Sequence, residues 1–141
     1  MNKKKIIYFI LFILVIFFVT LGCSLSNWKE KAKTELEQNE KELLEIVELV
    51  KNNELEQDYD TLYKIPDKYS KLTKDGLIVV YQNDDDGVQI GFYVFRGMQT
   101  GSCYLMYSSG GEDMIKKNES GHPIIQIENF DGNWYYVETD Y

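Results

Sequence analysis

Apolar residues follow three different patterns along the chain. Residues 6–21 are apolar almost without interruption, and lysines occupy positions 3–5 just before them. Residues 28–52 contain no Gly or Pro, and their apolar side chains recur three, four or seven positions apart, which predicts one long amphipathic helix. From residue 75 onward, apolar and polar residues tend to alternate with a period of two, which is typical of strands.

The predicted helix differs between its two halves. Asn27, with Glu30 three positions later, is a capping pattern that predicts the helix start. Residues 29–42 are mainly charged, whereas the second half is strongly apolar. We therefore expect the second half to pack on the core, and the first half to project as a stalk or lie on the surface. A self-associating coiled-coil stalk is the alternative, although Asn39 and Glu40 interrupt its seam.

The rest of the chain predicts an antiparallel sheet. Strands are expected at residues 77–82, 88–96, 102–108, 124–130 and 134–141, with Asp131-Gly132 as a strong hairpin signal between the last two. Short helical pieces or turns are expected near residues 59–63 and 66–72, and a polar connection follows residue 110. The predicted fold class is α+β, with one long amphipathic helix packed on about five strands after an N-terminal hydrophobic segment.

The N-terminal segment carries the features of a membrane-targeting signal. A basic start before an apolar run is inserted into membranes with the lysines on the cytoplasmic side. The sixteen residues of 6–21 would span about 24 Å as a helix, which is short of a hydrocarbon core of about 30 Å. Thr20-Leu21-Gly22-Cys23 follows, and it resembles the cleavage box of bacterial lipoproteins. The resemblance implies cleavage before Cys23 and lipidation of that cysteine. An uncleaved signal anchor and a released secreted protein are the alternatives.

These features divide the chain into three parts. Residues 1–22 are a signal peptide or signal anchor, residues 23–57 a membrane-proximal helix, and residues 58–141 a small sheet domain packed on that helix. Every acidic residue follows the apolar segment, so loss of its three lysines would change the net charge from −8 to about −11. Such a charge repels phosphate backbones, which argues against nucleic acid as a partner.

The predicted sheet has apolar or aromatic residues on both faces. One set is expected to face the helix, and the opposite set includes Tyr81, Tyr93, Phe95, Tyr104 and Met106. Because one helix covers one face, either residues 58–74 cover the other face or that face binds something. Tyr81, Tyr93, Phe95 and Tyr104 are therefore a candidate binding face for a glycan or a protein. The alternative is that these aromatic residues form core and cross-strand pairs.

The sequence shows no catalytic or metal-binding constellation. His122 is the only histidine, and Cys103 falls inside a predicted strand, where we expect a buried, unreactive thiol. Residues 84–87, Asp-Asp-Asp-Gly, fit a hairpin turn better than a calcium loop. Arg96 is expected to pair with one of the many acids rather than to hold a ligand. No catalytic residue, metal or cofactor is predicted.

Together these patterns predict a non-enzymatic binding or interaction module of the bacterial cell envelope. It would be anchored to the outer side of the membrane by a lipid or by its apolar helix, with a protein or glycan partner and no nucleic acid. One alternative is a structural or assembly partner in an envelope complex through the helix at 28–50. Another is an enzyme that uses carboxylate and tyrosine residues.

Overall fold

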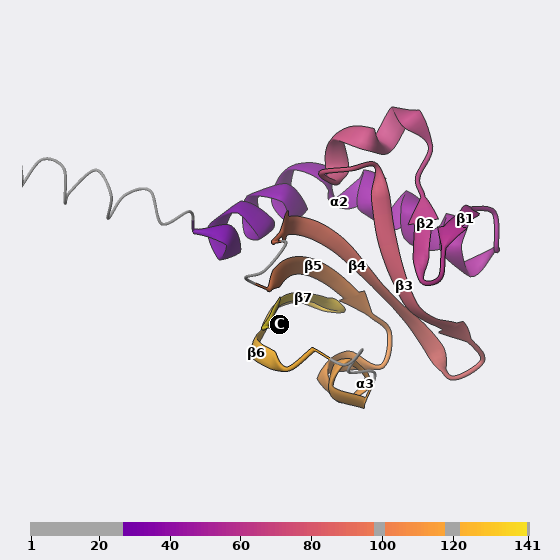
Figure 1. The fold of residues 1–141 in the computed structure, drawn as a ribbon. Helices are drawn as coiled ribbons and strands as arrows, with labels where there is room; N and C mark the ends of the chain where they lie inside the picture. Colours follow the sequence, from indigo (N-terminus) through magenta and orange to yellow (C-terminus); the bar gives the residue numbers. More distant parts are fainter. Residues whose placement is uncertain (1–26, 98–100, 118–121, 141) are drawn as a thin grey trace, which may run out of the picture.

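A long helix lies across one face of a seven-stranded antiparallel sheet (Figure 1). The computed structural model describes residues 27–97, 101–117 and 122–140. In chain order, the elements are α2 (Trp28–Lys51), β1 (Glu56–Tyr59), β2 (Leu62–Lys64), the 3-10 helix η1 (Asp67–Leu72), β3 (Leu77–Asp84), β4 (Gly87–Arg96), β5 (Ser102–Ser108), α3 (Gly111–Lys117), β6 (Ile124–Asp131) and β7 (Trp134–Thr139). The strand order is β1-β2-β3-β4-β5-β7-β6, and every neighbouring pair is antiparallel. The predicted α+β class is confirmed.

The strand count of five is wrong, because β1 and β2 form a hairpin at one edge of the sheet. All four residues of β1 are exposed, so the strand lacks the alternation that marks a half-buried strand. The hairpin turns at Asp60, whose φ of 50° is a conformation that Asp tolerates better than most residues. Sequence patterns therefore indicated a turn here but not the strands on either side of it.

The predicted polar connection after residue 110 contains the short helix α3. Met114 and Ile115 are its buried residues. They pack α3 on the face of the sheet opposite α2, where Ile115 joins a cluster with Tyr104 and Tyr135. Two adjacent apolar residues in a polar stretch are too few to show a helical period, so the sequence did not reveal this helix.

Both halves of α2 pack on the sheet, so the first half does not project as a stalk but lies on the surface, which was the other expectation. Its start is capped as expected, since Asn27 Oδ1 accepts a hydrogen bond from the backbone N–H of Glu30 at 3.3 Å. In the charged first half, Ala32 and Leu36 are buried against the sheet. Six residues form the buried stripe: Ala32, Leu36, Leu43, Ile46, Val47 and Val50.

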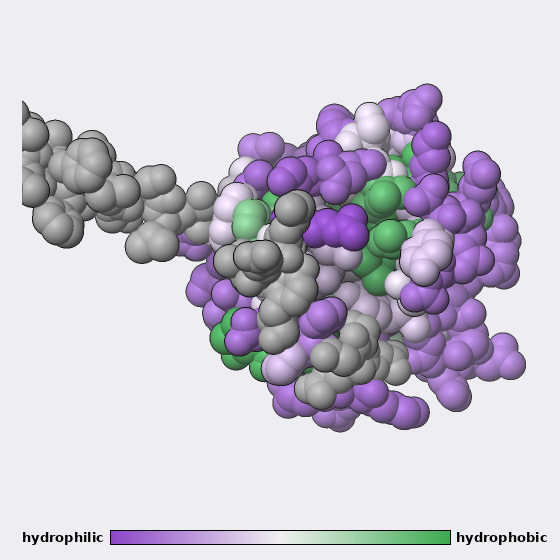
Figure 2. All heavy atoms as spheres, viewed as in Figure 1, coloured by the Kyte–Doolittle hydropathy of each residue, from purple (hydrophilic) through white to green (hydrophobic). Residues whose placement is uncertain are grey.

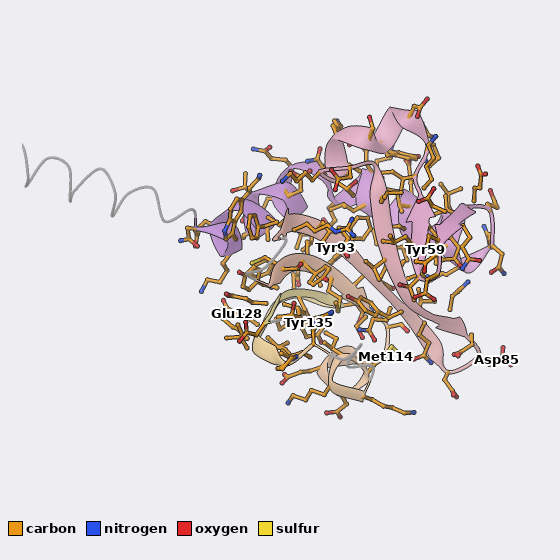
Figure 3. All side chains as sticks on the ribbon, viewed as in Figure 1. Tyr59, Asp85, Tyr93, Met114, Glu128 and Tyr135 are labelled. Carbon is orange, nitrogen blue, oxygen red and sulfur yellow. The ribbon has the colours of Figure 1, made fainter. Side chains whose placement is uncertain are left out.

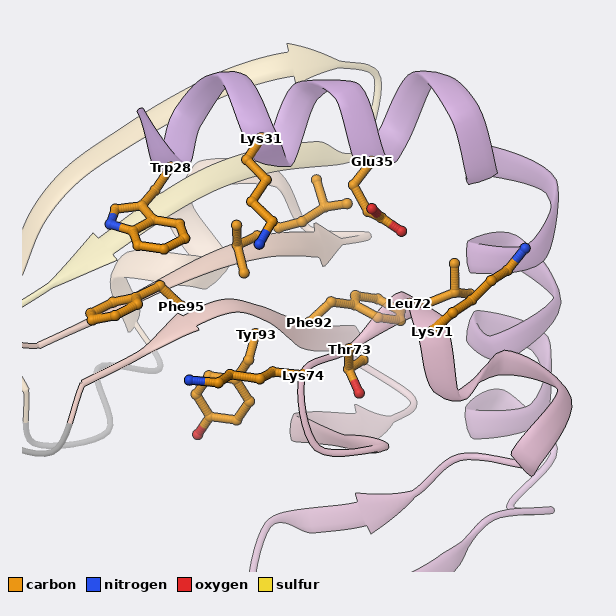
Figure 4. Close-up of a pocket in the computed structure, with 12 residues that line it drawn as sticks. Trp28, Lys31, Glu35, Lys71, Leu72, Thr73, Lys74, Phe92, Tyr93 and Phe95 are labelled. Carbon is orange, nitrogen blue, oxygen red and sulfur yellow. The ribbon is translucent and has the colours of Figure 1, made fainter. Parts of the chain in front are cut away.

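A kink at Asn39 divides α2 into two segments. Asn39 has φ −130° and ψ 18°, and its side-chain amide donates to the carbonyl oxygen of Glu35 at 3.3 Å. Side chains that bond the preceding turn compete with the regular backbone ladder and bend helices. The two segments run in different directions in Figure 4, where the first lies over the aromatic residues of β4.

The sheet carries a separate apolar cluster on each face. The cluster on the α2 side includes Phe92, Leu105 and Tyr136. The cluster on the opposite side, here called the second face, includes Val79, Tyr104 and other residues of β5 and β7, together with Ile115 of α3. Thus α3 covers part of the second face, and Leu62 of β2, within residues 58–74, packs against the same cluster.

The membrane-targeting prediction concerns residues that lie outside the described ranges, Cys23 among them. Within those ranges, no helix is both long and apolar enough to cross a membrane.

Packing of the first segment of α2 can be tested with two leucines of the same helix. Leu36 is 6% exposed and Leu44 is 39% exposed. We expect Leu36→Ala to lower the free energy of unfolding by about 2–5 kcal/mol, because it leaves a cavity under the helix. Leu44→Ala should lower it by less than about 1 kcal/mol. Urea unfolding followed by circular dichroism measures both, and equal losses would restore the stalk interpretation.

Candidate functional site

A hollow of about 300 Å³ opens on the second face, between the ends of β3, β4 and β5. We call it the tyrosine hollow, because Tyr81, Tyr93 and Tyr104 line it, together with Arg96 and His122. Figure 2 views the molecule from the same side as Figure 1 and shows a small apolar area near the centre, with polar side chains around it. Figure 3 shows Tyr93 in the same view, on β4. Three of the four predicted binding-face residues are therefore brought together.

The three tyrosines meet because their strands are neighbours. Tyr93 of β4 pairs directly with Tyr104 of β5, and their ring centroids lie 4.8 Å apart. Tyr81 of β3 meets the Tyr104 ring nearly edge-on, at 6.4 Å and 76°. Gly91 of β4 leaves the space for this contact. A Cβ atom there would lie 3.0 Å from the Tyr104 ring and 3.2 Å from the Tyr81 ring.

Tyr104 forms the buried floor of the hollow. Its side chain is 6% exposed, and its hydroxyl shares hydrogen bonds with the side chains of Tyr81, Tyr93 and Ser102. Burial raises the pKa of the Tyr104 hydroxyl far above its usual range, with a further contribution from Tyr81. At neutral pH the hydroxyl therefore stays protonated and serves as a hydrogen-bonding group rather than as a nucleophile.

Charged and polar groups surround the tyrosines. The Arg96 guanidinium lies over the Tyr93 ring, with its carbon 5.1 Å from the ring centroid. This cation–π contact differs from the expected ion pair, and the exposed guanidinium also reaches the rim of the hollow. Asp60, His122 and Asp140 complete the rim. The hollow thus has flat apolar surfaces next to hydrogen-bonding side chains, some positively and some negatively charged.

Phe95 lies on the other side of the sheet from the tyrosines. The register of β4 against β5 shifts between Tyr93 and Phe95, so that Phe95 is opposite Cys103. This bulge adds a residue and reverses the alternation after Tyr93. Phe95 then stacks on Trp28 at the start of α2, with ring centroids 4.6 Å apart. Its predicted place on the binding face is wrong for this reason.

The other residues singled out in the sequence do not assemble a reactive site. Cys103 is buried in the cluster under α2, where burial raises the pKa of its thiol, whereas His122 is at the tyrosine hollow on the second face. Asp84 terminates β3, and its carboxylate accepts hydrogen bonds from Gln82 and from the Asp86 backbone within the hairpin. In the described ranges, no group of three His, Cys, Asp or Glu residues is arranged to hold a metal ion.

A second cavity, which sequence reasoning missed, lies on the α2 side of the sheet. We call it the lysine cavity; its volume is about 230 Å³, and Lys31, Lys71 and Lys74 are among its lining residues (Figure 4). Trp28 and Phe92 line it as well. Its walls come from α2, from the end of η1 and the segment after it, from β4 and from β5. No local pattern in the sequence brings these elements together.

The raised pKa of Tyr104 predicts how stability changes in alkali. Below about pH 10, both the folded and unfolded chains keep this proton. Above that pH the unfolded chain releases it while the folded chain does not, so stability falls as pH rises, by about 1.4 kcal/mol per pH unit for this group. Tyr104→Phe should remove that share of the slope, as measured by urea unfolding between pH 8 and 12.

Tyr59, which is 75% exposed, supplies the matched control. Tyr59→Phe should leave the slope unchanged. Identical slopes for the wild type and Tyr104→Phe would show that the Tyr104 hydroxyl ionises freely in the folded protein.

In comparisons with known proteins, the chain matches no family model, no curated protein and no solved structure. Its function is therefore argued from its own residues and geometry.

Proposed function

We propose that this chain is a binding module held on the outer side of a membrane by its N-terminal segment, and that it takes its ligand in the tyrosine hollow. The observation that carries the proposal is the convergence of Tyr81, Tyr93 and Tyr104 on the sheet face that α2 leaves uncovered. Aromatic rings beside hydrogen-bonding groups, in a concave site, are the usual composition of a small-ligand site.

The shape and chemistry of the hollow favour a short glycan as the ligand. A sugar ring has an apolar face, which packs on a tyrosine ring, and hydroxyl groups, which hydrogen-bond to charged side chains. Arg96, His122 and Asp60 stand at suitable places on the rim. A stable protein partner would need about 800 Å² on this chain, in a broad surface rather than in a hollow of this size.

Two other functional classes have less support. An assembly role through α2 would need an apolar helix face free for a partner, but the apolar stripe of α2 is buried in the chain's own core. Catalysis by tyrosine would need a hydroxyl that ionises near neutral pH, whereas burial moves the pKa of Tyr104 the other way.

The proposed tether places the hollow near the membrane surface. Cys23 precedes the first residue of α2, Trp28, by five positions, a distance of at most about 18 Å along an extended chain. A lipidated Cys23 would therefore hold the domain close to the headgroups. A ligand found within the cell envelope, such as a wall glycan, would be within reach of such a site.

Glycan binding can be measured by calorimetry on the full chain in nanodiscs, with short N-acetylglucosamine oligosaccharides as the probe. We expect Arg96→Gln to weaken binding about fivefold, and Tyr81→Ala to weaken it tenfold or more through loss of stacking area. Lys31→Gln, in the lysine cavity, serves as the control and should not change the affinity. Failure of the wild type to bind, or equal affinities in all variants, would refute glycan binding at this hollow.

The lipid tether can be tested with a radioactive fatty acid in growing bacterial cells. We expect the wild-type chain to incorporate label and to partition with membranes, and Cys23→Ser to lose the label, since the sulfur is the acceptor. The buried Cys103 makes Cys103→Ser a matched control that should keep the label. Absence of label from the wild-type chain would contradict the lipoprotein interpretation and leave the uncleaved anchor or the released protein, and label that persists in Cys23→Ser would show that Cys23 is not the acceptor.

A further inference from the structure

The lysine cavity has an apolar floor and positively charged side chains, a combination that favours a small organic anion. Phe92 and Leu105 of the sheet are its buried apolar residues, and Trp28, stacked on Phe95, forms one end. Figure 4 shows the first segment of α2 lying above these rings and Lys31 extending from that helix toward β4. The cavity volume of about 230 Å³ equals the space of about eight water molecules.

The side chains around this cavity are mainly positive, whereas the net charge of the whole chain is negative. Three lysines and one carboxylate, that of Glu35, line the cavity, in a chain whose net charge is −8. Lys71 is engaged by Glu42, with the amine nitrogen 3.2 Å from the carboxylate oxygen. The ion pairs found in the described ranges do not include Lys31 or Lys74. The Lys31 ammonium lies over the Trp28 ring, 5.3 Å from its centroid, so that it stands beside the aromatic end of the cavity. Two cationic side chains beside an apolar floor favour an anion.

A buried hydroxyl in the cavity wall adds a polar contact. Thr73 lines the cavity and is 6% exposed, and its side-chain oxygen has no hydrogen-bond partner among the described residues. A buried polar atom without a partner costs about 1–3 kcal/mol, which a hydrogen bond to a ligand would recover. This unpaired oxygen is a second indication of a ligand, separate from the charge of the lysines.

Glu35 further restricts the chemistry of the occupant. Its carboxylate accepts a hydrogen bond from the Asn39 amide at 2.9 Å, and burial raises its pKa while Lys31 opposes the shift. The positive charges of the lysines would repel a cationic ligand that approached this carboxylate. An anion instead meets Lys31 and Lys74 and leaves the Glu35–Asn39 contact in place.

From these observations we infer that the lysine cavity binds a small aromatic carboxylate, with the ring against Trp28 and Phe92 and the carboxylate at Lys31, Lys74 and Thr73. The volume of about 230 Å³ favours a small ligand, since it lies below the range of about 300–1,000 Å³ of the pockets that hold drug-sized ligands. Most of this site lies on the α2 side of the sheet, although Tyr93 lines both this cavity and the tyrosine hollow. The proposal does not depend on the proposed function.

The two tryptophans of the chain allow a direct test by fluorine NMR. The full chain is labelled with 5-fluorotryptophan in nanodiscs and titrated with phenylacetate, with 2-phenylethanol as the neutral analogue and inorganic phosphate as the anion without a ring. Trp28 lines the cavity and Trp134 is buried in the core, so the Trp28 signal, assigned with Trp28→Phe, should move saturably. We expect phenylacetate to bind at least tenfold more tightly than either analogue.

Variants of exposed residues keep the test independent of folding. Lys31 and Lys74 are exposed, so Lys31→Gln and Lys74→Gln should fold normally and weaken phenylacetate about fivefold each. Arg96→Gln, at the tyrosine hollow, is the control and should change the affinity less than twofold. Equal binding of 2-phenylethanol would overturn recognition by the lysines. Equal binding of phosphate would reduce the site to a surface charge effect, and an unmoved Trp28 signal would remove the site altogether.

Discussion

Burial of the apolar stripe of α2 against the sheet is the interaction on which the rest of the structure depends. A straight helix of 24 residues would be about 36 Å long, and strands of a sheet turn relative to one another. The kink at Asn39 lets each segment of the helix follow its own part of the sheet. The second segment then fills the core with Leu43, Ile46 and Val47, and the first closes over the end of β4. Both the core and the lysine cavity follow from this bend.

A single helix leaves the second face of the sheet to be covered in another way. The short helix α3 covers part of it through Ile115, and the tyrosines occupy the part beyond. Tyrosine suits such a half-covered face because its ring packs on the sheet while its hydroxyl remains hydrogen-bonded. The mutual contacts of Tyr81, Tyr93 and Tyr104 therefore have a structural role as well as the proposed binding role.

Elements with a strong local signal were predictable from the sequence, and elements fixed by tertiary packing were not. The Asn27 cap marks the start of α2, and the Asp131-Gly132 turn joins two strands as expected. The exposed strand β1 and the short helix α3 show no clear period of apolar residues, so the sequence did not reveal them. Contacts with neighbouring elements stabilise them instead.

The same distinction applies to the two candidate sites, of which one was predictable from the sequence and the other was not. Tyr81, Tyr93 and Tyr104 could be identified because each lies opposite the apolar set of its strand. The lysine cavity could not, since Thr73 and Lys74 reach Trp28 and Lys31 only after α2 has folded onto the sheet. Charge counts over the whole chain also concealed it, because three lysines carry little weight among 23 acidic residues.

The bulge in β4 determines which aromatic residues serve which side of the sheet. With regular alternation, Phe95 would follow Tyr93 onto the second face and crowd the tyrosine hollow. The register shift instead sends Phe95 to the α2 side, opposite Cys103, where Trp28 stacks on it. That stacking fixes the first turn of α2, the part of the described chain nearest the proposed tether. One extra residue in a strand thus keeps the hollow open on one face and holds the end of the helix on the other.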